Sequence, residues 1–176
     1  AIGHADKLLT RAGGDALSTR PYPITAWSSV NALGSSTPQI ISEHRRVRPA
    51  LSAPPPESIF STVCGRVSPG LSGLAGALAD LDSRNNRVVQ QALSEMAEAL
   101  ATARNRWGPK RIGICVGSST SALDEIERAH ATHSETGTLP KGFDVFERGS
   151  AEGLVRALRA LSRFEGPVAV LSNACA

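Results

Sequence analysis

The chain has 176 residues, of which 41% are hydrophobic and 20% charged, and its formal net charge is +3. This length and composition are typical of one soluble globular domain with a hydrophobic core. The apolar runs are too short to cross a bilayer, and the first residues lack the apolar segment of a secretory signal, so we expect neither a membrane span nor secretion.

The N-terminal half is predicted to alternate between short elements and loops. The first twenty residues are polar and weakly periodic, so we expect 1–20 to be a poorly ordered leader. Beyond them, hydrophobic patterning and the positions of proline and glycine predict a strand, a helix, a proline-rich loop, a strand and a short helix. These elements cover residues 22–34, 35–41, 47–57, 58–67 and 71–81. Ser36 or Thr37 is expected to cap the first helix.

The C-terminal half carries the clearest periodicity. An apolar stripe predicts one long helix over 85–107, which Gly108 and Pro109 end. The continuous apolar run that follows is typical of a strand covered on both faces. The remaining pattern predicts a helix, a loop, a helix and a last strand, over residues 122–130, 131–149, 150–163 and 168–171. Because helices alternate with strands and aromatic residues are only 4%, we expect an α/β fold with a mainly parallel sheet.

The cysteines and the basic residues limit the kinds of site. The three cysteines, Cys64, Cys115 and Cys175, have no Cys-x-x-Cys spacing, which argues against a disulfide framework or a zinc site and favours a reducing, cytoplasmic compartment. The densest basic cluster extends from His44 to Arg48. No aromatic residues are interleaved with it, so a solvated face is favoured over a nucleic-acid surface.

Cys175 is the strongest candidate for chemistry. It follows a buried-looking strand and a turn of small residues, the place where a thiolate can be stabilised by backbone N–H groups. Acyl transfer through a thioester needs such a nucleophile beside an oxyanion-binding site. From the pattern alone, a small buried cysteine without catalytic role is the more common case.

Three further clusters have both a functional and a structural interpretation. Residues 117–121 could bind a phosphate at a helix N-terminus, as in a nucleotide-binding domain, but they lack the lysine and glycines of the known motifs, so a helix cap is favoured. His130 and His133 could share a metal, although surface positions are favoured. Residues 83–87 could cap a helix on the surface, or could place buried Arg and Asn side chains that brace loops.

Four segments in order resemble the β-ketoacyl-acyl-carrier-protein synthases, the condensing enzymes of fatty-acid and polyketide synthesis. The segments are Ile24–Gly34, Leu81–Arg87, Arg111–Ser121 and Val170–Ala176. The resemblance implies a thiolase-like fold of two α/β halves, of which residues 21–176 correspond to the N-terminal one, truncated after the nucleophile. It also implies that Cys175 accepts the acyl group. The family often has glycine where this chain has Ala122.

The resemblance further implies a ping-pong decarboxylative condensation without a cofactor or metal. The expected partners are an acyl carrier protein, acyl and malonyl thioesters, and a second synthase subunit in a homodimer or heterodimer. The residues that assist decarboxylation would lie beyond Ala176, so we expect this chain to be an incomplete fragment. The alternative is a non-catalytic, synthase-like scaffold that pairs with a carrier protein or a partner synthase.

Overall fold

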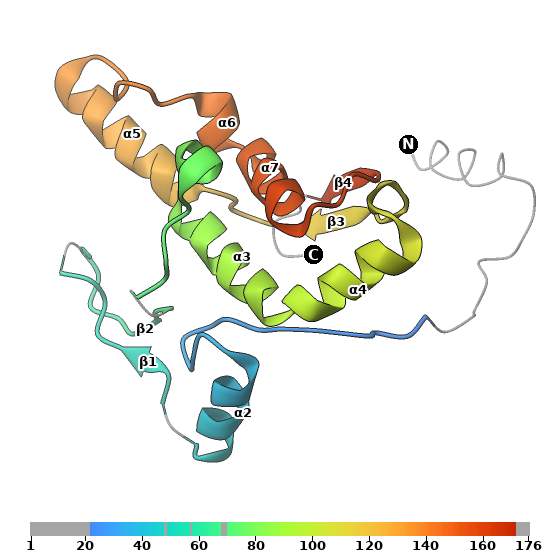
Figure 1. The fold of residues 1–176 in the computed structure, drawn as a ribbon. Coiled ribbons are helices and arrows are strands. Elements are labelled where there is room, and N and C mark those ends of the chain that lie inside the picture. The colour runs from blue at the N-terminus through green and yellow to red at the C-terminus, as the bar shows by residue number, and fades with distance from the viewer. Residues whose placement is uncertain (1–21, 48, 57, 68–69, 172–176) are drawn as a thin grey trace, which may run out of the picture.

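The computed structural model describes residues 22–47, 49–56, 58–67 and 70–171 (Figure 1). Within them no helix is both long enough and apolar enough to cross a membrane. The helices are α2 (Thr37–Arg45), α3 (Arg84–Glu95), α4 (Ala97–Trp107), α5 (Leu123–Thr136), α6 (Val145–Gly149) and α7 (Ala151–Ser162), with 3-10 helices η1 (Gly76–Leu81) and η2 (Pro109–Arg111). The strands are β1 (Leu51–Ser52), β2 (Cys64–Gly65), β3 (Ile114–Gly117) and β4 (Val168–Leu171).

The described strands form two separate pairs. β3 and β4 are parallel, with Ile114 opposite Val168 and Gly117 opposite Leu171. Parallel neighbours need a long crossover, and α5, α6 and α7 provide it. β1 and β2 are antiparallel and only two residues long each. The prediction of an α/β fold with parallel strands is therefore confirmed for β3 and β4.

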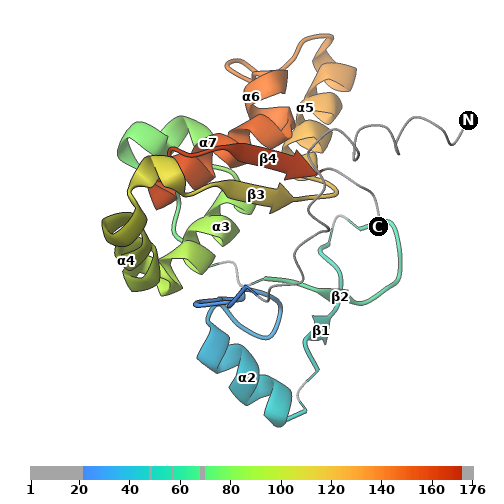
Figure 2. The same ribbon diagram turned by 90° about the vertical axis from the view of Figure 1, so that its right-hand side faces the viewer.

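Helices lie on one side of the β3–β4 pair. In Figure 2 the two strands face the viewer, with α7 and α3 behind them and α4 beside them. α2 and the β1–β2 pair lie on the opposite side of α3 and α4 from these strands in both views (Figures 1 and 2). The small core contains Leu74, Leu81 and Ala157, with Leu78 and Leu161 packed against it, so it joins η1 to α7.

Two helices begin at a serine N-cap. Ser36 is one of the two residues that the sequence predicts as the cap of α2, whereas Ser150, expected as the first residue of a helix, lies one position before α7. Ser36 is the N-cap of α2, and its hydroxyl accepts from the backbone N–H of Gln39 at 3.4 Å. Ser150 is the N-cap of α7, and its hydroxyl accepts from the backbone N–H of Glu152 at 3.0 Å. Each hydroxyl satisfies an N–H group that has no partner within its own helix.

The long helix predicted over 85–107 is two helices, α3 and α4, divided at Met96. The Ser28 hydroxyl donates to the Ala92 carbonyl at 2.8 Å, the acceptor that a continuous helix would give to the Met96 N–H. The Met96 N–H bonds instead to the Leu93 carbonyl at 3.1 Å. A side chain inserted into the helical ladder is a known cause of such breaks.

The strand predicted over 22–34 is wrong, although its glycine turn is present. Asn31 and Gly34 form an isolated bridge around the turn. The described residues before this turn pair with no strand. Their backbone and side-chain polar groups form hydrogen bonds with helices instead. The Ser28 hydroxyl reaches α3, as described above, and the Ser29 N–H donates to the Thr37 hydroxyl at 3.0 Å. These contacts take the place of a sheet ladder.

Three other elements differ from the prediction in extent. The strand predicted over 58–67 is confined to β2, and the helix predicted over 71–81 is the 3-10 helix η1, preceded by irregular chain. The loop predicted over 131–149 contains the last six residues of α5 and all of α6. α5 continues to Gly137, which ends it in the left-handed conformation at φ 75°. Asp144 caps α6 by accepting from the Glu147 N–H at 2.8 Å.

Candidate functional site

The first candidate region is the carboxyl end of the β3–β4 pair. Cys175, the predicted nucleophile, lies outside the described residues. The last described residue before it is Leu171, whose carbonyl accepts from the backbone N–H of Ser118 at 3.1 Å. This bond extends the β3–β4 ladder by one residue beyond Gly117. The structure thereby places the 117–121 turn directly beside the end of the strand that leads toward Cys175.

The serines of this turn hold the turn itself. The Ser118 hydroxyl accepts from the Ser121 N–H at 2.9 Å, and Ser121 has a φ of 45°. Ala122, not a serine, is the N-cap of α5 and makes no side-chain cap bond, so the predicted helix cap is wrong. Ala122 itself has a φ of −104°, which suits any residue, so the departure from glycine there costs no backbone strain.

The face of the β3–β4 pair that points away from the helices is exposed in the described part of the chain. Burial alternates along β3, where Ile114 and Val116 are partly buried while Cys115 and Gly117 are exposed. Their partners on the exposed face are Ala169 and Leu171. The expectation of a strand covered on both faces is therefore not met within the described residues. A two-stranded pair with one open apolar face is marginal by itself.

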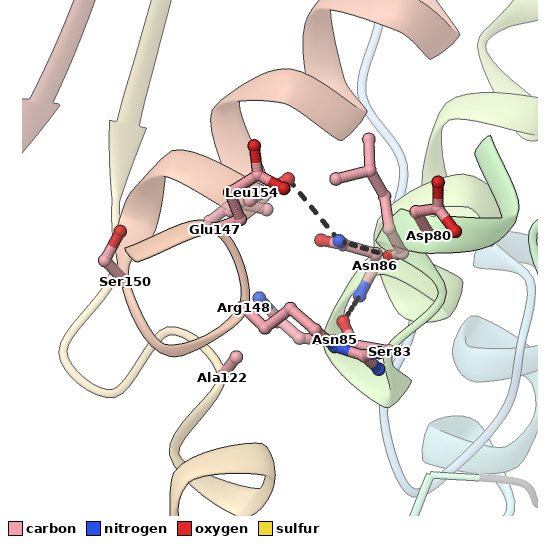
Figure 3. A pocket seen from close by; sticks show the side chains of 11 residues that line it. Asp80, Ser83, Asn85, Asn86, Ala122, Glu147, Arg148, Ser150 and Leu154 are labelled. Atoms are coloured by element: carbon pink, nitrogen blue, oxygen red, sulfur yellow. Dashed lines mark hydrogen bonds between the residues drawn. The ribbon is translucent and has the colours of Figure 1, made fainter. Parts of the chain in front are cut away.

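The second candidate region is the polar cluster at the start of α3, of which Figure 3 shows Ser83, Asn85 and Asn86. Arg87 binds Asp82 through two nitrogens: Nε donates to Oδ1 at 2.8 Å, and Nη2 bonds to Oδ2. Asp82 Oδ1 also accepts from the Leu74 N–H at 2.9 Å. The hydrogen bond from Arg87 is the main reason that the pKa of Asp82 lies below its usual value. Asp82 thus ties the chain before η1 to the first turn of α3.

Arg148 connects this cluster to α5 and α6. Its Nη2 donates to the Asp82 carbonyl at 3.3 Å and pairs with the Glu125 carboxylate at 3.0 Å. Arg128 pairs with the other oxygen of Glu125 at 2.7 Å and with Asp124. The Glu125 side chain is only 12% exposed, so its charge is balanced by two arginines in a partly buried setting.

Asn86 occupies the centre of this region. It is 3% exposed, and its side-chain nitrogen donates to the Leu81 carbonyl at 2.8 Å and to the Gly153 carbonyl at 3.5 Å. Of the two interpretations of residues 83–87, the structure therefore supports a buried brace for Asn86. Ser83 is at the same time the N-cap of α3, since its hydroxyl accepts from the Asn86 N–H at 3.2 Å.

The remaining predicted candidates do not form a site in the described residues. His130 and His133 are both on α5, and the part of the chain that the structure describes contains no group of three potential metal-ligating side chains. The described residues of the basic cluster, His44 to Arg46, lie at the end of α2, where Arg46 pairs with Glu43 at 2.9 Å. Sequence reasoning missed Arg148 and Glu125 as partners of the 82–87 segment, because no spacing rule links residues so far apart in the chain.

Comparison with known proteins finds similarity at the level of the solved structures. No protein-family model and no curated protein matches the chain. Among solved structures, a chain from the complex of a ketosynthase with its chain length factor, from Xenorhabdus doucetiae, superposes with a TM-score of 0.66 at 23% sequence identity. The match covers 84% of this chain and 40% of that chain. The chain therefore spans less than half the length of this neighbour, and it has a ketosynthase-like fold.

Proposed function

We propose that this chain is the N-terminal part of a β-ketoacyl-acyl-carrier-protein synthase, in which Cys175 accepts the acyl group. The observation that carries the proposal is the ketosynthase-like fold, obtained over most of a chain whose motifs resemble the same enzymes. The register of β3 against β4 adds support. It brings the 117–121 turn to Leu171, which precedes Cys175 by four residues, a reach of at most about 14 Å.

The proposed chemistry has two half-reactions. The Cys175 thiolate attacks the thioester carbonyl of an acyl carrier protein, forms a new thioester and expels the carrier's thiolate, which takes up the proton that the Cys175 thiol had lost. A malonyl thioester then loses carbon dioxide, and the carbanion left behind attacks the Cys175 thioester. The products of this half-reaction are carbon dioxide, the β-ketoacyl thioester and the free Cys175 thiolate, and no oxidant or cofactor is needed. The groups that assist decarboxylation would belong to residues after Ala176.

Acyl transfer to Cys175 tests this proposal. The complete protein, with every residue that its gene encodes, is incubated with an acyl carrier protein loaded with a short acyl chain, and each cysteine peptide is weighed by mass spectrometry. The acyl mass is expected on Cys175. Cys175→Ala should abolish loading, while Cys115→Ala, which changes an exposed thiol of β3, should load within twofold of the wild type. Acylation of another cysteine instead would contradict the assignment.

A second function is favoured by a specific observation, because the structural neighbour comes from a complex of a ketosynthase with a chain length factor. In this alternative the protein is a non-catalytic subunit that pairs with a partner synthase. A complete protein that takes no acyl group on any cysteine, yet forms a stable heterodimer with a synthase encoded beside it, would favour the subunit over the enzyme. Sedimentation of the mixture and of each component measures that pairing.

A further inference from the structure

A small cavity lies between the start of α3 and the junction of α6 with α7. Its volume is about 10 Å³, and its walls include Ser83, Asn86, Arg148, Ser150 and Gly153. Figure 3 shows Asn86 and Ser83 on one side of it and Arg148 and Ser150 on the other. The cavity thus lies between α3 and the α6–α7 junction, which are far apart in the sequence.

Only one of the two polar atoms of the Asn86 side-chain amide makes hydrogen bonds among the described residues. Its nitrogen donates to the carbonyls of Leu81 and Gly153, as described above, whereas its oxygen, Oδ1, is buried and has no hydrogen-bond partner among the described residues. Buried amide oxygens nearly always have a partner, because losing the hydrogen bonds that water gives them is costly. The oxygen therefore points to a donor that the described protein atoms do not supply.

Rotation of the amide does not remove this problem. A turn of 180° would place Oδ1 against the carbonyl oxygens of Leu81 and Gly153, which are both acceptors. The amide nitrogen would then face the cavity, and two favourable bonds would be replaced by repulsive contacts. The observed orientation is therefore fixed by the two carbonyls, and Oδ1 must find its donor on the cavity side.

The backbone at Gly153 cannot move to fill the cavity beside Asn86 Oδ1. A Cβ at Gly153 would lie 2.2 Å from the Glu147 carbonyl oxygen, so the α7 backbone already touches the α6 backbone there. Side chains can change rotamer to fill a gap, but backbone packed this closely cannot advance further without breaking helix geometry. The space beside Asn86 is thereby preserved.

We propose that this cavity binds one water molecule, which donates a hydrogen bond to Asn86 Oδ1 and links α3 to the α6–α7 junction. The volume corresponds to about one water, for which about 10–15 Å³ is the smallest sufficient space. The lining provides hydroxyls from Ser83 and Ser150 and the guanidinium of Arg148 as further partners. A larger ligand does not fit, and an apolar one would leave Oδ1 without a donor.

The test is a high-resolution crystal structure of the complete protein, together with NMR detection of bound water. We expect one peak of spherical density about 2.6–3.2 Å from Asn86 Oδ1. We also expect a cross-peak from a long-lived water to the Asn86 side-chain amide protons, and none to those of Asn105, which is exposed on α4. A cavity without density in a well-ordered molecule, or Oδ1 bonded directly to a protein donor, would overturn the proposal.

The variant Asn86→Leu tests whether Oδ1 itself holds the water or whether the other polar groups of the cavity are sufficient. It removes Oδ1 and keeps the branching of the side chain, so the density peak should disappear. The cross-peak is not a readout for this variant, because leucine has no side-chain amide protons. A peak that stays in place would show that other lining groups hold the water, and the proposed link through Oδ1 would be wrong. If Asn86→Leu does not fold, the wild-type density and the comparison with Asn105 still decide. Neither readout depends on Cys175 or on synthase activity.

Discussion

The carboxylate of Glu95, the last residue of α3, binds the first residue of α2, Thr37. It accepts from the Thr37 N–H at 3.0 Å with each oxygen, and from the Thr37 hydroxyl at 2.8 Å. A carboxylate at a helix N-terminus satisfies a free N–H and interacts favourably with the helix dipole. One side chain thereby holds α2 against the end of α3, although the two residues are far apart in the sequence.

Replacing Glu95 with alanine should release α2. We expect the free energy of unfolding of the complete protein to fall by about 1 kcal/mol, the typical effect of losing an N-terminal cap. Urea unfolding followed by circular dichroism measures this. Glu135→Ala, at an exposed glutamate near the end of α5, is the matched control and should change stability little. Equal effects from the two variants would show that the Thr37–Glu95 contact does not stabilise the protein.

Gly153 should tolerate no side chain. Because a Cβ there would meet the Glu147 carbonyl oxygen at 2.2 Å, Gly153→Ala must separate α6 from α7, at a cost of about 3 kcal/mol. A Cβ at Gly73 would have Asp82 Oδ2 as its nearest neighbour, at 3.4 Å, which is an ordinary contact. Gly73→Ala is therefore the control. Similar melting temperatures for the two alanine variants would contradict the close approach of the helices.

The Asp82–Arg87 pair should make stability depend on pH in the acid range. The pKa of Asp82 in the folded protein lies below its ordinary value of 3.8, mainly because Arg87 donates to its carboxylate. The unfolded state therefore takes up the proton first as the pH falls. The stabilisation is fully present above the ordinary pKa and is lost as the pH falls from there through the lowered folded value.

Urea unfolding of wild type and Asp82→Asn between pH 7 and pH 2.5 measures this dependence. The stability difference between them should be constant down to about pH 4.5 and should then shrink with further acidification. Asp124→Asn, which alters a surface pair with Arg128, is the control and should differ little from wild type at any pH. If the stability difference between wild type and Asp82→Asn increased as the pH fell, the Asp82–Arg87 pair would not be its cause.

Replacing Arg163, the C-cap of α7, with glycine should make the folded protein more stable. It has a φ of 58° and a ψ of 34°, a left-handed conformation that costs a residue with a Cβ about 1 kcal/mol. Arg163→Gly should therefore stabilise the protein by up to about that amount. Arg163→Ala keeps the Cβ and should bring no gain, which separates the backbone effect from loss of the arginine charge. Equal stabilities for the glycine and alanine variants would refute the explanation.

Local signals in the sequence predicted those parts of the fold that depend on neighbouring residues. Ser36 is predicted as a possible cap of α2 because its hydroxyl and the N–H group that it satisfies are only three residues apart. The apolar stripe of α3 and α4 likewise arises within one segment. The division at Met96 was not predicted, because its cause, the Ser28 hydroxyl, comes from a segment far from α3 in the sequence.

The same distinction between local and long-range contacts applies to the candidate sites. Residues 83–87 were recognised as a polar cluster, but pattern alone left open which side chains were buried, since the partners of Asn86 and Asp82 include Gly153 and Arg148. The position of the 117–121 turn beside Leu171 required the register of β3 against β4. The role of Cys175 stays a prediction, because it lies outside the described residues.

The parallel pairing of β3 with β4 has a consequence for the order of folding. The two strands are separated by all of α5, α6 and α7, so closing this pair costs more chain entropy than forming any of these helices. We therefore expect β4 to dock late, on α7 and β3 already in place. Substitutions in β4 would then accelerate unfolding more than they slow folding. During synthesis, the strand that leads toward Cys175 would be the last described element to reach its native position.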